Sequence, residues 1–180
     1  MVKTQIRLIF EFYAKQKELA LLTTLNIQPD KIKVNIIDMT FTKKDDKYLH
    51  VFAIIGETSI NSKELQKSND AQIKQFKKNL TKLNIVYKIH KSVMIYDLGN
   101  VSDTPGVYRQ FISLLQCNNI KINFSISSSG SNISSNDTTL YFIVKQIEKT
   151  VNIINNFDWK NPDKMLCINY NNIKKLVNDY

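Results

Sequence analysis

The residues with the clearest potential for chemistry form a turn between a predicted strand and a predicted helix. In Asp103-Thr104-Pro105-Gly106, either Asp103 or Thr104 can cap the helix, and Pro105 suits its first turn. A helix N-terminus presents free N–H groups and partial positive charge, which favour a carboxylate. Asp103 and Asn100 offer oxygens for an ammonium group. The turn could therefore hold both poles of an amino acid, although the same pattern also caps a helix without any ligand.

The elements that must position this turn follow the same order in both halves of the chain. Apolar periodicity and turn residues predict strands at 5–12, 31–39, 48–56, 85–90, 92–98, 121–127, 139–145 and 164–170, helices at 17–26, 71–84, 105–117, 146–157 and 171–180, and loops at 58–70 and 128–137. Each half predicts a β-α-β-β-α-β order. We therefore expect an α+β fold of two tandem ferredoxin-like modules, residues 4–90 and 92–180. Each would have an antiparallel sheet with its helices on one face.

Residues 92–170 resemble an ACT domain of the type found in the regulatory part of aspartate kinases. The resemblance rests on the strand Val93–Tyr96, the Asp103–Val107 turn, the stretch Asn119–Asn123 and the strand 139–144. It implies a non-catalytic regulatory protein that binds an amino acid at the interface between modules. The implied ligand-binding residues, with hydroxyls added from the second strand, are Asn100, Asp103, Thr104, Gly106, Val107, Asn119, Ile120, Ile122, Ser125 and Ser127. The serine run of that strand departs from the family pattern and leaves the identity of the amino acid open.

Residues 4–90 lack the Asp-x-Pro-Gly turn and resemble instead the NIL domain of methionine-importer ATPases. The stretches that carry this resemblance are Ile6–Phe10, Val34–Ile37 and Asn84–Tyr87. Both families share the ferredoxin-like topology and sense amino acids, so this second resemblance implies the same kind of function.

No motif indicates catalysis, a cofactor or a metal. The sequence contains no GxxxxGK, GxGxxG or HExxH motif. His50 and His90 are far apart in the sequence and fall in separate predicted strands, which favours structural roles. The two cysteines, Cys117 and Cys167, fall in apolar patterns and are expected to be buried free thiols.

The formal charge of +9 leaves a nucleic-acid partner open as an alternative. In that case bases would stack on exposed rings of a sheet face, with Tyr48, His50, Phe52 or Tyr141 as candidates. A protein–protein adaptor without a small ligand is a further alternative. A homodimer or a partner enzyme is expected in the regulatory interpretation. No membrane span or signal peptide is indicated, so the expected location is cytoplasmic.

Overall fold

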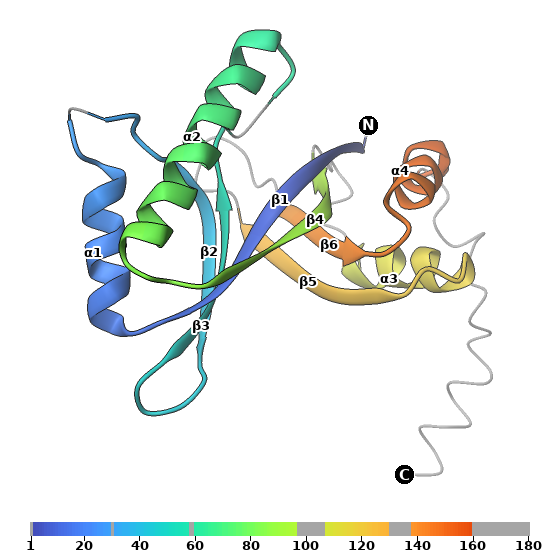
Figure 1. Ribbon diagram of the computed structural model, residues 1–180. Helices are drawn as coiled ribbons and strands as arrows, with labels where there is room; N and C mark the ends of the chain where they lie inside the picture. The colour runs from blue at the N-terminus through green and yellow to red at the C-terminus, as the bar shows by residue number, and fades with distance from the viewer. Residues whose placement is uncertain (1, 30, 58–59, 97–106, 130–137, 160–180) are drawn as a thin grey trace. The chain divides into compact units, whose positions relative to one another are not determined.

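The computed structural model describes residues 2–29, 31–57, 60–96, 107–129 and 138–159 (Figure 1). Within these ranges the elements are β1 Lys3–Ala14, α1 Gln16–Asn26, β2 Ile36–Lys43, β3 Leu49–Ile55, α2 Lys63–Lys82, β4 Tyr87–Tyr96, α3 Val107–Cys117, β5 Ile122–Ser129, β6 Thr138–Val144 and α4 Ile147–Asn156. The predicted strand 164–170 and helix 171–180 lie outside the described residues. The α+β class of the prediction is confirmed.

The chain forms two compact units. The continuous unit comprises residues 7–90, and the two-segment unit comprises residues 1–6 with residues 91–180. The first six residues therefore group with the second half of the chain rather than with the residues that follow them. Two self-contained tandem modules remain a prediction.

The continuous unit has the strand order β2-β3-β1-β4, which is the order expected for a ferredoxin-like βαββαβ module. β3 pairs antiparallel with both β1 and β2, and Phe12 lies opposite Val51. Because side chains alternate along a strand, Phe10, Phe12, Val51 and Ala53 share one face. That face packs against α1 and α2 through Leu22, Phe76 and Leu80. The rings of Phe10 and Phe76 meet edge to face, with their centroids 5.0 Å apart.

Helix α2 begins at Lys63, eight residues before the predicted start at residue 71. Residues 58–70 were predicted as a loop because they are polar, and from Lys63 onward that prediction is wrong. Lys, Glu and Gln are good helix formers, and Ser62 accepts a hydrogen bond from the Leu65 N–H at 3.2 Å, which caps the helix. The early turns bury polar side chains, Asn69 and Gln72, so their inward face shows no apolar stripe.

Strand β4 is one continuous strand where the sequence predicted two, at 85–90 and 92–98. The sequence prediction leaves Lys91 between these two strands and begins the second strand at Ser92. Ser92 is fully buried, whereas Lys91 is exposed. Alternation of sides along one strand accounts for both residues without a break.

The two-segment unit has the strand order β1-β4-β6-β5, with β6 antiparallel to β4 and β5. Its core contains Val93, Ile95, Phe111, Leu115, Phe142 and Ile154. Val2 packs in the same core, and the Thr4 hydroxyl donates a hydrogen bond to Asn155 Oδ1 of α4 at 2.9 Å. These contacts explain why residues 1–6 belong to this unit. In the sheet, β1 is the neighbour of β4.

Cys117, the last residue of α3, is disulfide-bonded, so the predicted free thiol at this position is wrong. The one other cysteine of the chain, Cys167, lies outside the described residues. No helix in the described ranges is long and apolar enough to cross a membrane.

Candidate ligand-binding site

The structure describes only part of the predicted amino-acid site. Asn100, Asp103, Thr104 and Gly106 lie outside the described residues, and Val107 is the first residue of α3. The other five predicted residues lie after α3 or on β5, and the structure describes all of them.

Asn119 and Ile120 end helix α3. Asn119 has a φ of 56°, the left-handed conformation typical of the residue that follows a helix. The Ile120 N–H donates to the Leu115 carbonyl at 2.9 Å, and the Asn119 N–H donates to that of Gln116 at 2.9 Å. The Ile120 side chain is buried in the core, and Ile122 packs against that core. Of these three predicted residues, only Asn119 therefore presents an exposed side chain.

The same termination occurs at the end of α2. Asn84 has a φ of 54°, and the Ile85 N–H donates to the Leu80 carbonyl at 3.0 Å. Ile85 is buried in the core of the continuous unit. An Asn-Ile pair thus ends a helix in both units. The Asn119-Ile120 pair, which was predicted to bind the ligand, therefore has a structural role in ending helix α3.

Ser125 is close to the first turn of α3. The Ser125 and Tyr108 hydroxyls share a hydrogen bond. Ser125 lies opposite Phe142 in the β5–β6 ladder, and the Tyr108 ring stacks on that of Phe142 at a centroid distance of 6.0 Å. Ser127, exposed, follows two positions along β5 and therefore points to the same side of the strand. We call Tyr108, Ser125 and Ser127 the hydroxyl edge.

The hydroxyl edge carries groups that can bind a polar ligand. Its hydroxyls can donate hydrogen bonds to a carboxylate or accept them from an ammonium group. Ser125 and Tyr108 connect the middle of β5 to the start of α3, and a helix start favours negative charge. Within the described ranges, no group of three or more His, Cys, Asp or Glu side chains is arranged to hold a metal ion.

Sequence reasoning missed a second polar cluster, which lies in the continuous unit. The Glu11 carboxylate is hydrogen-bonded to His50 Nε2 through Oε1 at 2.9 Å and to His90 Nε2 through Oε2 at 2.6 Å. Burial alone would raise the pKa of Glu11, but its hydrogen bonds and electrostatic interactions with His90 and His50 outweigh burial and hold this pKa below its ordinary value. The three residues, the Glu11 cluster, connect strands β1, β3 and β4. Only the strand register, unknown from sequence, brings them together.

The aromatic residues beside this cluster are stacked on one another. The His50 ring lies 4.6 Å from both the Tyr13 and the Phe52 rings, and the Lys44 ammonium lies 3.9 Å from the centre of the Tyr13 ring. Partners therefore already occupy the ring faces that a stacked base would need. Two further candidates for base stacking are also engaged: Tyr141 is buried, and the Lys15 ammonium lies 5.6 Å from the Tyr48 ring.

No protein-family model matches the sequence, and no curated protein is similar to it in sequence. The fold is similar to that of the regulatory subunit of aspartate kinase from Thermus flavus, with a TM-score of 0.52 and 8% identity. That match covers 86% of this chain and 94% of the subunit. The regulatory subunit from Thermus thermophilus gives a TM-score of 0.48 at 10% identity, with the same coverage of both chains.

The aspartate kinase of Clostridium acetobutylicum gives a TM-score of 0.47 at 18% identity, over 86% of this chain. The chain spans about a third of the length of that kinase, because the match covers 34% of it. At 8% identity the similarity to the Thermus flavus subunit establishes the fold alone: an α+β protein with an antiparallel sheet.

Proposed function

We propose that this protein is a non-catalytic regulatory protein that binds a free amino acid beside the start of α3. The observation that carries the proposal is the extent of the fold match: nearly all of this chain corresponds to nearly all of a regulatory subunit of aspartate kinase. A regulatory protein of this kind would act on a partner enzyme or as a homodimer.

The hydroxyl edge supports an amino acid as the ligand. Tyr108 and Ser125 place two hydroxyls beside the first turn of α3, where the helix N-terminus favours a carboxylate. Asp103 and Asn100, which precede α3 in the sequence, supply oxygens suited to an ammonium group. In this proposal Ile120 and Ile122 hold the strand in place from the core, and Asn119, which follows the opposite end of α3 from Tyr108, ends the helix and does not contact the ligand.

Regulation would follow from differential affinity. A ligand shifts a conformational equilibrium only if it binds one arrangement more tightly than another. Amino-acid binding to one arrangement of the protein or of its complex would therefore supply the signal, and no reaction need occur at the site.

A thermal unfolding screen with the twenty common amino acids tests this proposal. A ligand that binds only the folded protein stabilises it by about 2.7 kcal/mol at roughly 100 times its Kd. We expect one amino acid, or a chemically related pair, to raise Tm, and the Tyr108→Phe variant to weaken that effect while keeping the ring stacked on Phe142. If no amino acid raises Tm at 10 mM, a concentration of the order of weak metabolite affinities, the amino-acid proposal is wrong.

A further inference from the structure

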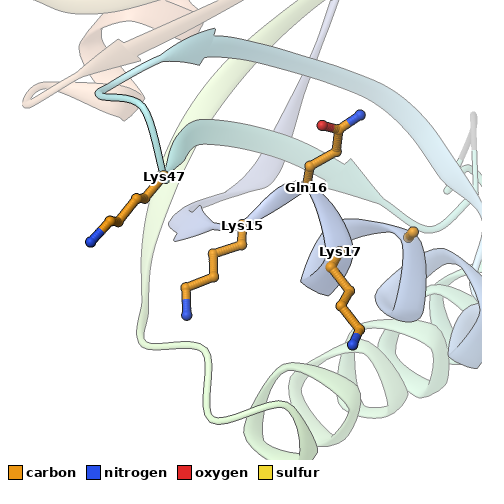
Figure 2. Close-up of a pocket in the computed structure, with 5 residues that line it drawn as sticks. Lys15, Gln16, Lys17 and Lys47 are labelled. Atoms are coloured by element: carbon orange, nitrogen blue, oxygen red, sulfur yellow. The ribbon is translucent and has the colours of Figure 1, made fainter.

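A basic pocket lies in the continuous unit, where β1 passes into α1. It is open, has a volume of about 790 Å³, and is lined by Lys15, Gln16, Lys17, Ala20 and Lys47. Figure 2 shows the three lysine side chains extending to the same side, with Gln16 turned the opposite way. Ligand pockets in proteins span roughly 300–1,000 Å³, so the volume suits a metabolite. We call this site the lysine pocket.

The positive charge of the lysine pocket comes from side chains on two separate elements. Lys15 and Lys17 lie at the start of α1, and Lys47 lies in the turn between β2 and β3. The Lys17 and Lys47 ammonium groups have no hydrogen-bond or ion-pair partner in the part of the chain that the structure describes. The Lys15 Nζ lies 3.8 Å from a Glu18 carboxylate oxygen and 5.6 Å from the centre of the Tyr48 ring, so both of its contacts are distant.

The backbones that carry these lysines are held in place. The Lys15 N–H donates to Glu18 Oε2 at 2.8 Å, which closes the start of α1. The N–H groups of Lys47 and Tyr48 both donate to Asp45 Oδ1 at 2.8 Å, which fixes the β2–β3 turn. These bonds also lower the pKa of Asp45, the larger effect coming from the Lys47 N–H. The nearby carboxylates Glu18 and Asp45 thus hold backbone N–H groups.

The chemistry that fits this arrangement is a compact polyanion. A single exposed lysine–anion pair contributes little to affinity, because water and salt screen it. Three ammonium groups around one pocket can act together only on a ligand that carries several negative charges close to one another. Phosphate groups linked in series provide this, and lysine binds phosphate as a point charge.

We propose that the lysine pocket binds a small ligand with two or more phosphate groups. A nucleic-acid strand fits less well, because the neighbouring ring faces of Tyr13 and His50 are already stacked and offer no platform for bases. The pocket lies in the continuous unit, whereas the hydroxyl edge lies in the two-segment unit. The inference is therefore independent of the proposed amino-acid function.

Calorimetric titration of the full chain with pyrophosphate at low and at 150 mM salt tests this inference. We expect saturable binding that weakens as salt rises, and a loss of affinity of at least tenfold in the Lys15→Gln, Lys17→Gln, Lys47→Gln triple variant. Lys78→Gln, which removes an exposed lysine of α2 outside the pocket, is the matched control and should leave the affinity unchanged. Circular dichroism should show that both variants remain folded.

A second arm of the experiment distinguishes the source of the phosphate groups. A fluorescent twelve-residue oligothymidylate is titrated into the same proteins, with pyrophosphate as competitor. We expect weak oligonucleotide binding that pyrophosphate displaces. The proposal is overturned if pyrophosphate does not bind at low salt or if the triple variant binds it as well as the lysine control does. It is also overturned if the oligonucleotide binds at least tenfold more tightly than pyrophosphate through the same lysines, since the partner is then a nucleic acid.

Discussion

The starts of α1 and α3 occupy the same place in the two units, and their side chains differ in kind. Each helix follows the first strand of a ferredoxin-like order, β1 for α1 and the 91–96 part of β4 for α3. Three lysines line the pocket at the start of α1. The first turn of α3 supplies the Tyr108 hydroxyl, which is bonded to that of Ser125, and the exposed cation Arg109. In our two proposals, the side chains at these helix starts decide which ligand each one accepts.

The two units also end a helix in the same way. Asn84 and Asn119 both adopt the left-handed conformation after α2 and α3, and each is followed by a buried isoleucine. Because the Asn-Ile pair occurs in both units, it is a feature of the fold and not of one ligand site. A residue shared by both units is better explained by the backbone, and a residue found in one unit is the better functional candidate.

The largest expected effect comes from Gly56→Ala, which disturbs the continuous unit alone. Gly56 has a φ of 117°, and a Cβ there would lie 1.9 Å from Asn69 Oδ1. Asn69 is buried and accepts a hydrogen bond from Arg7 Nη1, so it cannot move freely. We expect the free energy of unfolding to fall by about 2–3 kcal/mol, measured by urea denaturation followed by circular dichroism.

Two controls sharpen this prediction. Fluorescence of Trp159, which packs on Phe111 of the two-segment unit, should shift less than the circular dichroism signal. In an Asn69→Ala background the cost of Gly56→Ala should also drop, because the atom that clashes is gone. An unchanged cost in that background would show that the strain lies elsewhere.

The next effect concerns the Glu11 cluster, which has no counterpart among the described residues of the two-segment unit. Glu11→Gln replaces a carboxylate that accepts from two histidines with a group that has one acceptor oxygen. We expect a loss of about 1–2 kcal/mol in the free energy of unfolding at neutral pH, measured by urea denaturation. His50→Gln removes one partner and keeps the carboxylate, and serves as the comparison.

The pH dependence of the same variant has a definite sign. The pKa of Glu11 in the folded protein is held below its ordinary value of 4.5 by His90 and His50 despite its burial. Between the folded-state and the unfolded-state pKa of Glu11, the unfolded chain binds more protons than the folded protein does. The stabilisation that Glu11 provides is therefore complete above the unfolded-state pKa and is lost as pH falls through the folded-state pKa. Glu11→Gln should flatten the stability profile below about pH 4.5. An equally steep profile in the variant would assign the acid sensitivity to other carboxylates.

The smallest expected effect is that of replacing Asn84 or Asn119, the residues that end α2 and α3, with glycine. Glycine adopts the left-handed conformation as readily as asparagine does, so Asn84→Gly and Asn119→Gly should each change the free energy of unfolding by less than about 0.5 kcal/mol. Neither variant should change the affinity for an amino acid, because Asn119 follows the last turn of α3 and Tyr108 lies in its first turn. Weaker amino-acid binding in Asn119→Gly alone would place a ligand contact at this end of the helix.

The sequence predicted those elements that carry regular apolar spacing. The strands 5–12 and 139–145 and the helix 146–157 each lie within three residues of the observed limits of β1, β6 and α4. The early turns of α2 were missed because they bury Asn69 and Gln72, which a search for apolar residues passes over. The sequence prediction divides the single strand β4 at Lys91, an exposed residue that alternates with the buried Ser92 along one strand.

The candidate sites could be predicted less well, for a geometric reason. Glu11, His50 and His90 meet because their strands lie side by side in a particular register, which no local pattern contains. The lysine pocket likewise needs Lys47, carried by a distant turn, to lie next to the start of α1. The α3 start was predicted because its residues are adjacent in the sequence, and Ser125 was added only through the family resemblance.

The measurement that tests the central claim most directly is calorimetric titration of an amino acid into three proteins: the unaltered chain, the Tyr108→Phe, Ser125→Ala double variant, and the triple lysine variant. We expect one amino acid to bind the unaltered chain and the triple lysine variant with equal affinity, and to bind the double variant at least tenfold more weakly. Amino-acid binding that survives in the double variant, or that is lost with the lysines, would contradict the assignment of the site to the start of α3.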